Sequence, residues 1–297
     1  MRVATQTDYF ARAFGERKAV EKLGEIGFDA LDFSMFEVIR QQEHPINQNS
    51  YEAYARELRH IAGESGTCFN QAHAPFPTLL KDDHEYNRNF PAIKRSIEFA
   101  GMLGAEQIVV HPVSFPGTTD EILRFNLELF ESLVPLLRQF QIKVALENMF
   151  WHDCAAGANR AGACGVGETF IAMYDMLDSR YFTCCLDVGH CGLVGETAQK
   201  MIMELGQKRL GALHVHDNDF AMDRHTMPFL CKLDWDSITK ALSDIGYLGD
   251  FTFEADNVYS GFPTELYEDV ARLMLKVGRH LTKMIERRGC RSDGSER

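Results

Sequence analysis

Residues 182–218 read FTCCLDVGHCGLVGETAQKMIMELGQKRLGALHVHDN and hold one complete unit of the repeat that organises the chain. The unit opens with an apolar run, Phe182–His190, and closes with a second one, Leu210–Asn218. Both runs are nearly continuous in apolar residues until a carboxylate or a histidine follows, which is typical of parallel strands covered on both faces. The segment between them is expected to be helical, so the stretch predicts a strand, a helix and a second parallel strand.

The same unit recurs along the whole chain. Helical spacing separates the apolar runs; in Arg17–Phe28, for example, Val20, Leu23 and Ile26 share one face. Similar helical spacing marks Tyr51–Gly66, Asn89–Gly104, Thr119–Phe140 and Trp235–Tyr247. The eight expected strands are Arg2–Tyr9, Ala30–Met35, Cys68–Pro75, Gln107–Val113, Lys143–Asn148, Phe182–His190, Leu210–Asn218 and Asp250–Asp256.

Eight strand–helix units in 297 residues predict a single (β/α)8 TIM barrel, which we expect to span residues 1–288. A doubly wound open sheet is the competing fold. It would predict a GxGxxG turn after the first strand, and the sequence has none there. The polar residues 289–297 are expected to form a disordered tail.

Composition narrows the class of protein. The formal net charge of −12 argues against nucleic acid as the main partner, because phosphodiester backbones are bound by basic surfaces. The N-terminal residues lack the apolar core of a signal peptide, and no apolar run is long enough to span a membrane. The eight cysteines show no CxxC pairing and are expected to be mostly reduced core residues, so a cytoplasmic protein is predicted.

Two segments between the expected elements are irregular. Met149–Gly167 follows the fifth strand and is rich in Gly and Ala, with the aromatic pair Phe150 and Trp151 near its start. Asp217–Leu233 follows the seventh strand. Both are expected to be long loops over the mouth of the barrel, where TIM-barrel enzymes place their active sites.

Polar residues able to bind a metal recur at the ends of successive strands. The series His73, His111, Glu147, Asp187, His214 and Glu254 is spaced by 38, 36, 40, 27 and 40 residues, about one strand–helix unit each time. A closed parallel barrel turns that repeat into a ring of side chains around one cavity. Since carboxylates rarely lie beside buried strands unless they are paired or coordinate an ion, the series predicts a metal site.

The donor types limit the metal. Carboxylates and imidazoles form a mixed oxygen and nitrogen set that suits Mn²⁺, Mg²⁺, Co²⁺ or Zn²⁺, with Mn²⁺ our first choice. The absence of cysteine ligands argues against a structural zinc site.

The segments ALEN, LDVGH, HVHDND followed by DRH, and TFEAD resemble the xylose-isomerase-like superfamily of TIM barrels over essentially the whole chain. The superfamily includes sugar isomerases, ketose 3-epimerases, inositol-catabolism enzymes and type IV apurinic endonucleases. The resemblance places the shared metal site on Glu147, Asp187, His214 and Glu254, and a substrate-contacting histidine on His190.

The endonuclease branch of that superfamily holds three zinc ions, and matching residues exist here too. They are His73, His111, His190, Asp223 and His225. The acidic charge, and the lack of an aromatic and basic loop set that could penetrate a duplex, weigh against DNA repair. The segment DRHTMPFLCKLDW also departs from the Gly-rich stretch that the superfamily often carries there.

The resemblance implies a metal-dependent sugar isomerase or epimerase. Glu147 and Glu254 would remove and return a proton next to a carbonyl through an enediolate held at the metal. His216, Arg224, Phe150 and Trp151 are weaker substrate-binding candidates. A lyase that β-eliminates from oxidised sugars or glycosides would share the first step, and a multi-zinc phosphodiesterase is the third alternative. The expected partner is a small sugar or sugar derivative, and a homo-oligomer is left open.

Overall fold

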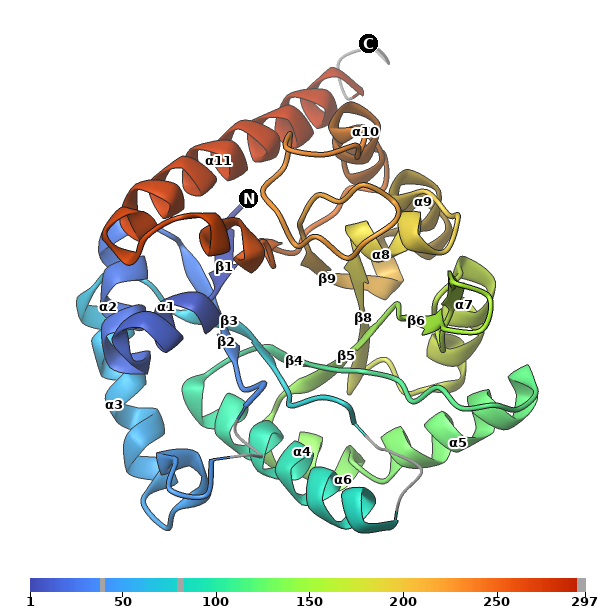
Figure 1. The fold of residues 1–297 in the computed structure, drawn as a ribbon, viewed down its shortest axis with the longest axis horizontal. Helices are drawn as coiled ribbons and strands as arrows, with labels where there is room; N and C mark the ends of the chain where they lie inside the picture. The colour runs from blue at the N-terminus through green and yellow to red at the C-terminus, as the bar shows by residue number, and fades with distance from the viewer. Residues whose placement is uncertain (38–40, 79–82, 293–297) are drawn as a thin grey trace.

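The computed structural model describes residues 1–37, 41–78 and 83–292, and in them eight parallel strands form a nearly closed barrel inside a ring of helices (Figure 1). The barrel strands are β1 (Val3–Gln6), β2 (Ala30–Ser34), β3 (Phe69–His73), β4 (Gln107–Val110), β5 (Lys143–Glu147), β8 (Phe182–Asp187), β9 (Leu210–His214) and β10 (Phe251–Phe253). The predicted TIM barrel is therefore confirmed.

Strand order follows the chain around the barrel. Hydrogen-bonded neighbours run β10, β1, β2, β3, β4, β5, β8, β9, and all of these pairs are parallel. The circle closes between β9 and β10 through a single bridge, Val215 with Phe253, where the Val215 amide donates to the Thr252 carbonyl at 2.9 Å. This sequential order excludes the doubly wound sheet.

Helices cover the outside of the barrel (Figure 1). They are α1 (Asp8–Phe14), α2 (Glu16–Ile26), α3 (Tyr51–Glu64), α4 (Asp83–Leu103), α5 (Thr119–Glu131), α6 (Val134–Phe140), α7 (Gly167–Met176), α8 (Val188–Leu193), α9 (Ala198–Arg209), α10 (Trp235–Asp244) and α11 (Tyr267–Ser292), with short 3₁₀ turns η2 (Pro45–Asn47), η3 (Asp256–Gly261) and η4 (Thr264–Leu266). Among the residues described, no helix has the length and apolar character needed to cross a membrane.

The packing of the strands shows which way the polar residues at the strand ends point. Most buried apolar side chains pack between strands and helices, whereas Val109, Ala145, Cys185 and Ala212 form a small separate cluster of their own. Side chains two residues apart on a strand share a face. His111, Glu147, Asp187 and His214 each follow one of these four small residues by two positions. The alternation of each strand therefore turns its polar end residue toward the same side as this cluster, one layer higher.

Three expectations about irregular segments and boundaries need correction. Met149–Gly167 is not simply a loop, because β6 (Phe150–Asp153) and β7 (Ala158–Ala161) pair as an antiparallel hairpin. The expected helix Thr119–Phe140 is two helices, α5 and α6, which break before Pro135 because proline fits a first turn but not a helix interior. The expected strands also end earlier than predicted; β8 stops at Asp187, which caps α8.

The C-terminal helix extends further than the sequence suggested. Helix α11 runs to Ser292 and so includes residues 289–292, the first four residues of the segment 289–297 that we expected to be disordered. The rest of that segment, 293–297, lies outside the described residues.

Candidate metal centre

Four strand ends bring their acidic and histidine side chains to one point. Glu147 ends β5, Asp187 ends β8, His214 ends β9, and Glu254 follows β10. One ligand atom from each lies within 4.8 Å of the others, and all four residues are buried. An ion about 2 Å from each donor spans about 4 Å across, so the four residues need only a small contraction to hold a cation.

His214 is oriented by a residue that the sequence did not single out. Its Nδ1 lies 2.8 Å from Glu254 Oε2 and 3.2 Å from Glu147 Oε1, so this nitrogen faces the candidate ion. Its Nε2 lies 2.9 Å from the Gln71 amide nitrogen and 3.4 Å from Oδ2 of Asp32, a fully buried carboxylate on β2 that also accepts from Gln71 at 2.7 Å. A carboxylate behind a ligating histidine fixes the ring and makes its free nitrogen a better ligand.

A second set of ligands meets the other oxygen of Glu147. Oε2 of Glu147 lies 3.0 Å from Nε2 of His111 and 3.5 Å from Nε2 of His73. The two histidine nitrogens are 3.1 Å apart, so at most one of them can carry a proton in that contact. Glu147 therefore lies between two candidate cation positions, with one oxygen toward each.

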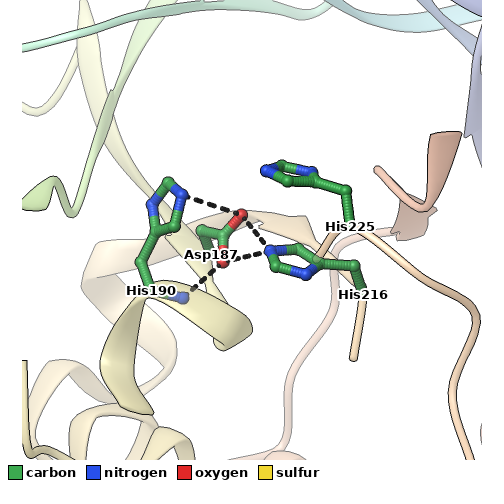
Figure 2. Close-up of side chains that lie close together, drawn as sticks. All are labelled: Asp187, His190, His216 and His225. Atoms are coloured by element: carbon green, nitrogen blue, oxygen red, sulfur yellow. Dashed lines mark hydrogen bonds and ion pairs between the residues drawn. The ribbon is translucent and has the colours of Figure 1, made fainter. Parts of the chain in front are cut away.

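A third set gathers around Asp187 and the loop after β9 (Figure 2). Asp187, His190, His216 and His225 place one ligand atom each within 4.8 Å of the others. Oδ2 of Asp223 lies 2.8 Å from His225 Nε2 and 3.4 Å from His190 Nε2. The loop residues Asp223 and His225 thus meet His190, which lies on α8 directly after the neighbouring strand β8.

Backbone carbonyls fix the orientation of three of these histidines. Nδ1 of His73 contacts the Ala74 carbonyl, Nδ1 of His190 the Asn148 carbonyl, and Nδ1 of His225 the Glu254 carbonyl, each at 2.8 Å. Since a carbonyl only accepts, each Nδ1 must carry the proton. In the neutral ring, Nε2 is then left with a free lone pair directed at a carboxylate.

Three buried carboxylate oxygens test whether these residues fit a cation. Glu147 Oε2, Asp223 Oδ1 and Glu254 Oε2 have no hydrogen-bond partner in suitable geometry among the described residues, although histidine nitrogens lie close to each. Leaving such oxygens unsatisfied in a protein interior is costly. A divalent cation would satisfy these oxygens together with the neighbouring histidine nitrogens. The donor set therefore fits the predicted metal.

Histidines offset part of the carboxylate charge in the first two sets when no cation is bound. Burial alone would raise the pKa of Glu147, but His214 and His111 hold it well below its usual range. Burial lowers the pKa of His111, so this ring stays neutral. Burial opposes the protonation of His73 as well, but Glu147 outweighs it and raises the His73 pKa.

The third set depends on protonated histidines in the same way. Burial opposes charge on His190, but Asp187 and Asp223 raise its pKa well above the usual value. For His225, Asp223 likewise outweighs burial and raises the pKa to about 10. Protons on these rings therefore occupy the place that a cation would take, and binding of a metal must release them.

The loop that carries Asp223 and His225 is held by Asp217. This fully buried carboxylate accepts hydrogen bonds from the backbone amides of Phe229, Cys231 and Leu233 and from Nε1 of Trp235, at 3.0 to 3.1 Å. His225 itself has a left-handed backbone with φ of 41°, which is unfavourable for a residue with a side chain. The bonds to Asp217 supply a framework that can hold such a conformation.

The structure gives a physical role to the polar residues and the glycine of LDVGH and to His216 and Asn218 of HVHDN. Asp187 caps α8 by accepting from the amides of Gly189 and His190 at 2.8 Å. His216, fully buried, contacts both oxygens of Asp187 at 2.9 and 3.0 Å. A Cβ at Gly189 would collide with the His216 ring, so only glycine fits there. Asn218 donates to the Gly189 carbonyl at 2.7 Å and so joins the loop to α8.

A cavity of about 460 Å³, here called the mouth cavity, opens above the three sets. Its lining includes Gln6, Asp8, Tyr9, Arg12, Phe36, His73, Phe76, Pro77, His111, Glu147, Met149, Phe150, His190, Asp223, His225, Glu254, Asp256 and Asn257. A second cavity of about 540 Å³, between the β6–β7 hairpin and α5, has neither a carboxylate nor a histidine among its described lining residues. The ligand chemistry thus belongs to the mouth cavity.

The weaker substrate candidates separate in space. Phe150 lines the mouth cavity and packs edge-on against His190, with ring centroids 5.0 Å apart. Trp151 points the other way, lines the second cavity and is half exposed. Arg224 pairs with Asp219 at 2.8 Å and does not line the mouth cavity, and His216 lies behind Asp187 rather than at the cavity wall. Of these four residues, only Phe150 is in position to touch a molecule bound in the mouth cavity.

Sequence reasoning missed three buried acids of the centre. Asp32 interrupts the apolar strand ALDFS, and that interruption was a usable signal. Asp217 follows His216 in HVHDND, but nothing local marks it as the anchor of a loop. Asp256 lies two residues after Glu254 and is 7% exposed; burial, then Asp8 and Glu254, raises its pKa well above the usual value.

The fold and this arrangement of side chains define a TIM barrel with buried candidate metal-binding clusters, and the comparisons with known proteins place it in a family. The profile of the xylose isomerase-like TIM barrel family matches residues 20–277, so the chain belongs to that family. It is 28% identical over 279 residues to the uncharacterized protein y4fM of Sinorhizobium fredii, with 81% of each chain covered.

Solved structures with sugar-epimerase titles share the fold. A D-psicose 3-epimerase, solved in the presence of D-fructose, superposes with a TM-score of 0.74 at 17% identity and covers 95% of this chain and 99% of its own. A D-tagatose 3-epimerase-like protein gives a TM-score of 0.70 at 20% identity, covering 94% and 99%. At these identities the likeness concerns the fold alone.

Proposed function

We propose that the protein is a metal-dependent isomerase or epimerase of a small carbohydrate, acting by proton transfer at the carbon next to a carbonyl. The observation that carries the proposal is the placement of Glu147 and Glu254, which both line the mouth cavity, on one buried histidine, His214. Two carboxylates that share a cation and face one substrate are the groups that such a proton transfer needs.

The cavity favours a neutral substrate over an anionic one. Besides histidines, Arg12 is the one basic side chain among the described lining residues, and it already pairs with Asp8 at 2.9 Å. The lining carboxylates Asp8, Glu147, Asp223 and Glu254 would repel a phosphate that is not held by a cation. A sugar of five or six carbons suits a cavity of about 460 Å³.

The reaction can be written with this chain's own groups. A bound divalent cation, held by Glu147, Asp187, His214 and Glu254, would supply Lewis-acid stabilisation of negative charge on the substrate oxygens. One of the two glutamates takes the proton from the carbon, and the bonding electrons shift into the carbonyl to give an enediolate. The other glutamate, or the same one, returns a proton to the enediolate. Phe150 and His190 would hold the sugar and exclude water.

Isotope exchange in deuterated water tests this proposal. The metal-loaded protein should exchange the proton next to the carbonyl of D-fructose, D-tagatose or L-ribulose for deuterium. Glu254→Gln and Glu147→Gln should slow the exchange by about 10² to 10⁴-fold, because each removes a proton-transfer group. Glu131→Gln changes an exposed glutamate at the end of α5 and is the matched control. This variant should catalyse the exchange at the wild-type rate. Exchange by neither the protein nor any variant, with metal bound, would reject the enolate chemistry.

Product analysis separates the two reactions that share the first step. If the enediolate is reprotonated, a new ketose or aldose accumulates. If a substituent at the β-carbon leaves instead, an unsaturated ketone and the free leaving group appear, and the protein is a lyase.

One observation favours a second candidate, hydrolysis of a phosphodiester at three cations. The sets around Glu147–His73–His111 and Asp223–His190–His225 lie next to the first set and give three adjacent candidate positions. Three divalent ions would reverse the acidic character of the cavity and attract a phosphate.

Metal analysis combined with a nuclease assay decides between these candidates. Incision of a duplex that contains an abasic residue, by protein with about three metal equivalents, would establish the hydrolase. Three equivalents without incision, together with deuterium exchange into a ketose, would leave the isomerase as the function.

A further inference from the structure

One wall of the mouth cavity is built by residues that hold no candidate ion. It is formed where β1 leads into α1 and β10 leads into η3, and it is here called the β1–β10 wall. Its members are Gln6, Asp8, Tyr9, Arg12, Asp256 and Asn257. All of them line the cavity, but none belongs to the three candidate ligand sets.

Most polar groups of this wall already have partners within the protein. Gln6 Nε2 donates to Glu254 Oε1 at 2.6 Å, which fixes that glutamate from the wall side. Arg12 pairs with Asp8, and the Tyr9 hydroxyl contacts Asn257 Oδ1 at 3.2 Å. The wall is therefore rigid before any substrate arrives.

Asp256 is the exception. It is 93% buried, and no donor among the described residues reaches its Oδ2. Native proteins rarely leave a buried carboxylate oxygen without a partner. Oδ2 itself exposes almost no surface, but Asp256 lines the cavity, so a small rotation of its carboxyl group would bring an oxygen within reach of a donor on a bound molecule.

The surroundings of Asp256 define the chemistry of that donor. Asp8 and Glu254 contribute negative charge, and the basic groups Arg12 and His225 are already paired, with Asp8 at 2.9 Å and with Asp223 at 2.8 Å respectively. A phosphate at this end would meet carboxylates without a free basic partner. A hydroxyl group can donate to Asp256 without adding charge, and it can accept from a neighbouring donor at the same time.

We infer that the β1–β10 wall binds the end of the substrate remote from the reacting carbon, and that Asp256 receives a hydrogen bond from an unphosphorylated sugar hydroxyl there. The inference rests on the proposed function for the orientation of the substrate. It narrows the substrate class to free sugars, and it makes Asp256 a specificity-determining residue rather than a catalytic one.

Binding and exchange measured on the same variants test the inference. D-Fructose, D-tagatose and L-ribulose are titrated into the metal-loaded protein, and the tightest ligand is compared with its terminal phosphate ester. Wild type should bind the free ketose at least tenfold more tightly than the ester. Asp256→Leu should weaken binding of the ketose by about ten- to a hundredfold, because its hydroxyl loses a partner. Asp256→Asn, which still accepts a hydrogen bond, should stay within about threefold of wild type.

Two controls separate this role from a structural one. Asp269→Asn changes an exposed aspartate on α11 that does not line the cavity and should bind like wild type. Metal content should be unchanged in every variant, which shows that the ligand sets are intact. In Asp256→Leu the loss should appear in KM, with kcat within about threefold of wild type.

The outcomes distinguish the inference from the proposed function. Ketose binding that depends on Asp256, without deuterium exchange, would keep the wall as a sugar site and reject the isomerase. A kcat/KM for exchange that Asp256→Leu leaves unchanged, equal affinity for ketose and ester, or no binding of any free ketose would each overturn the role of Asp256.

Discussion

The histidines at the mouth show how single atoms decide what a residue can do. His214 turns Nδ1 toward Glu147 and Glu254, whereas His73 and His225 turn Nε2 inward. In each case the opposite nitrogen is occupied, by a backbone carbonyl or by Asp32. Because these outer partners set the ring and its proton, they are expected to influence metal affinity as strongly as a weak ligand does.

Asp32→Asn tests this effect at one residue. The amide cannot stabilise positive charge on the His214 ring as the carboxylate does, so metal affinity should fall by about ten- to a hundredfold. The measurement is a competitive titration with a fluorescent chelator, and the Gln71 contact to Asp32 Oδ2 at 2.7 Å should keep the side chain in place. An unchanged dissociation constant would show that Asp32 does not act through His214.

Metal affinity should also rise with pH. The pKa of His225 is raised to about 10 by Asp223 in opposition to burial, and Glu254, His190 and His216 also face this ring. A group with a raised pKa is protonated below that value, so at neutral pH a cation must displace the proton. The dissociation constant should therefore fall by about tenfold per pH unit for each proton released, in titrations between pH 6 and 8. His225→Ala should reduce that slope by one proton; an unaltered slope would contradict the assignment.

At the scale of elements, the irregular segment 217–233 is the loop that carries the candidate ligands Asp223 and His225. Its shape depends on Asp217, which binds four donors, and on three residues with left-handed backbones, Phe220, His225 and Phe229. Such a loop is stable only while these bonds persist, and it delivers two ligands to the third set.

Asp217→Asn should loosen this loop without unfolding the barrel. The amide can accept at one oxygen only, so at least one of the four bonded donors loses its partner, at about 2 to 3 kcal/mol. We expect faster cleavage of the segment in limited proteolysis and the loss of the metal equivalent that Asp223 and His225 hold. Asp219→Asn is the control: in this exposed turn it removes the ion pair with Arg224, while the remaining oxygen still accepts from the amides of Ala221 and Met222, so it should have a much smaller effect. Equal proteolysis rates in both variants would reject the anchoring role.

Sequence patterns could predict the barrel and the meeting of the candidate metal ligands because both follow from the order of the strands. Glu147, Asp187 and His214 stand at the ends of apolar strands, and closing the sheet brings strand ends together whatever the loops do. The patterns failed where conformation depends on distant bonds. The direction of Trp151 follows from a hairpin, the role of Asp217 from a loop that returns to it, and the contact of His214 with Asp32 from a strand five positions earlier in the barrel order.

For the molecule as a whole, β9 and β10 form the neighbouring strand pair of the barrel with the fewest paired residues. Only the Val215–Phe253 bridge joins these strands, whereas every other neighbouring pair shares three or more register partners. His214 ends β9, and Glu254 follows β10. A cation that both residues bind would therefore add a bond across the weakest pairing of the sheet.

Metal binding should accordingly raise the melting temperature. At a free metal concentration 100 times the dissociation constant, the native state gains about 2.7 kcal/mol, which corresponds to roughly 4 °C for a protein of 297 residues. Scanning calorimetry with and without a chelator measures the shift. Glu254→Gln should show a much smaller one. A melting temperature that does not respond to chelation would argue against a cation between β9 and β10.

The late position of β10 in the chain has a consequence for biosynthesis. Residues 251–254 are translated after the seven other strands, yet they complete both the closure of the sheet and the ligand set. A nascent polypeptide still on the ribosome should thus hold divalent ions only loosely. Tight loading would then mark chains in which translation has passed Glu254, and ribosome-arrested fragments that stop before and after this residue should differ in metal retention.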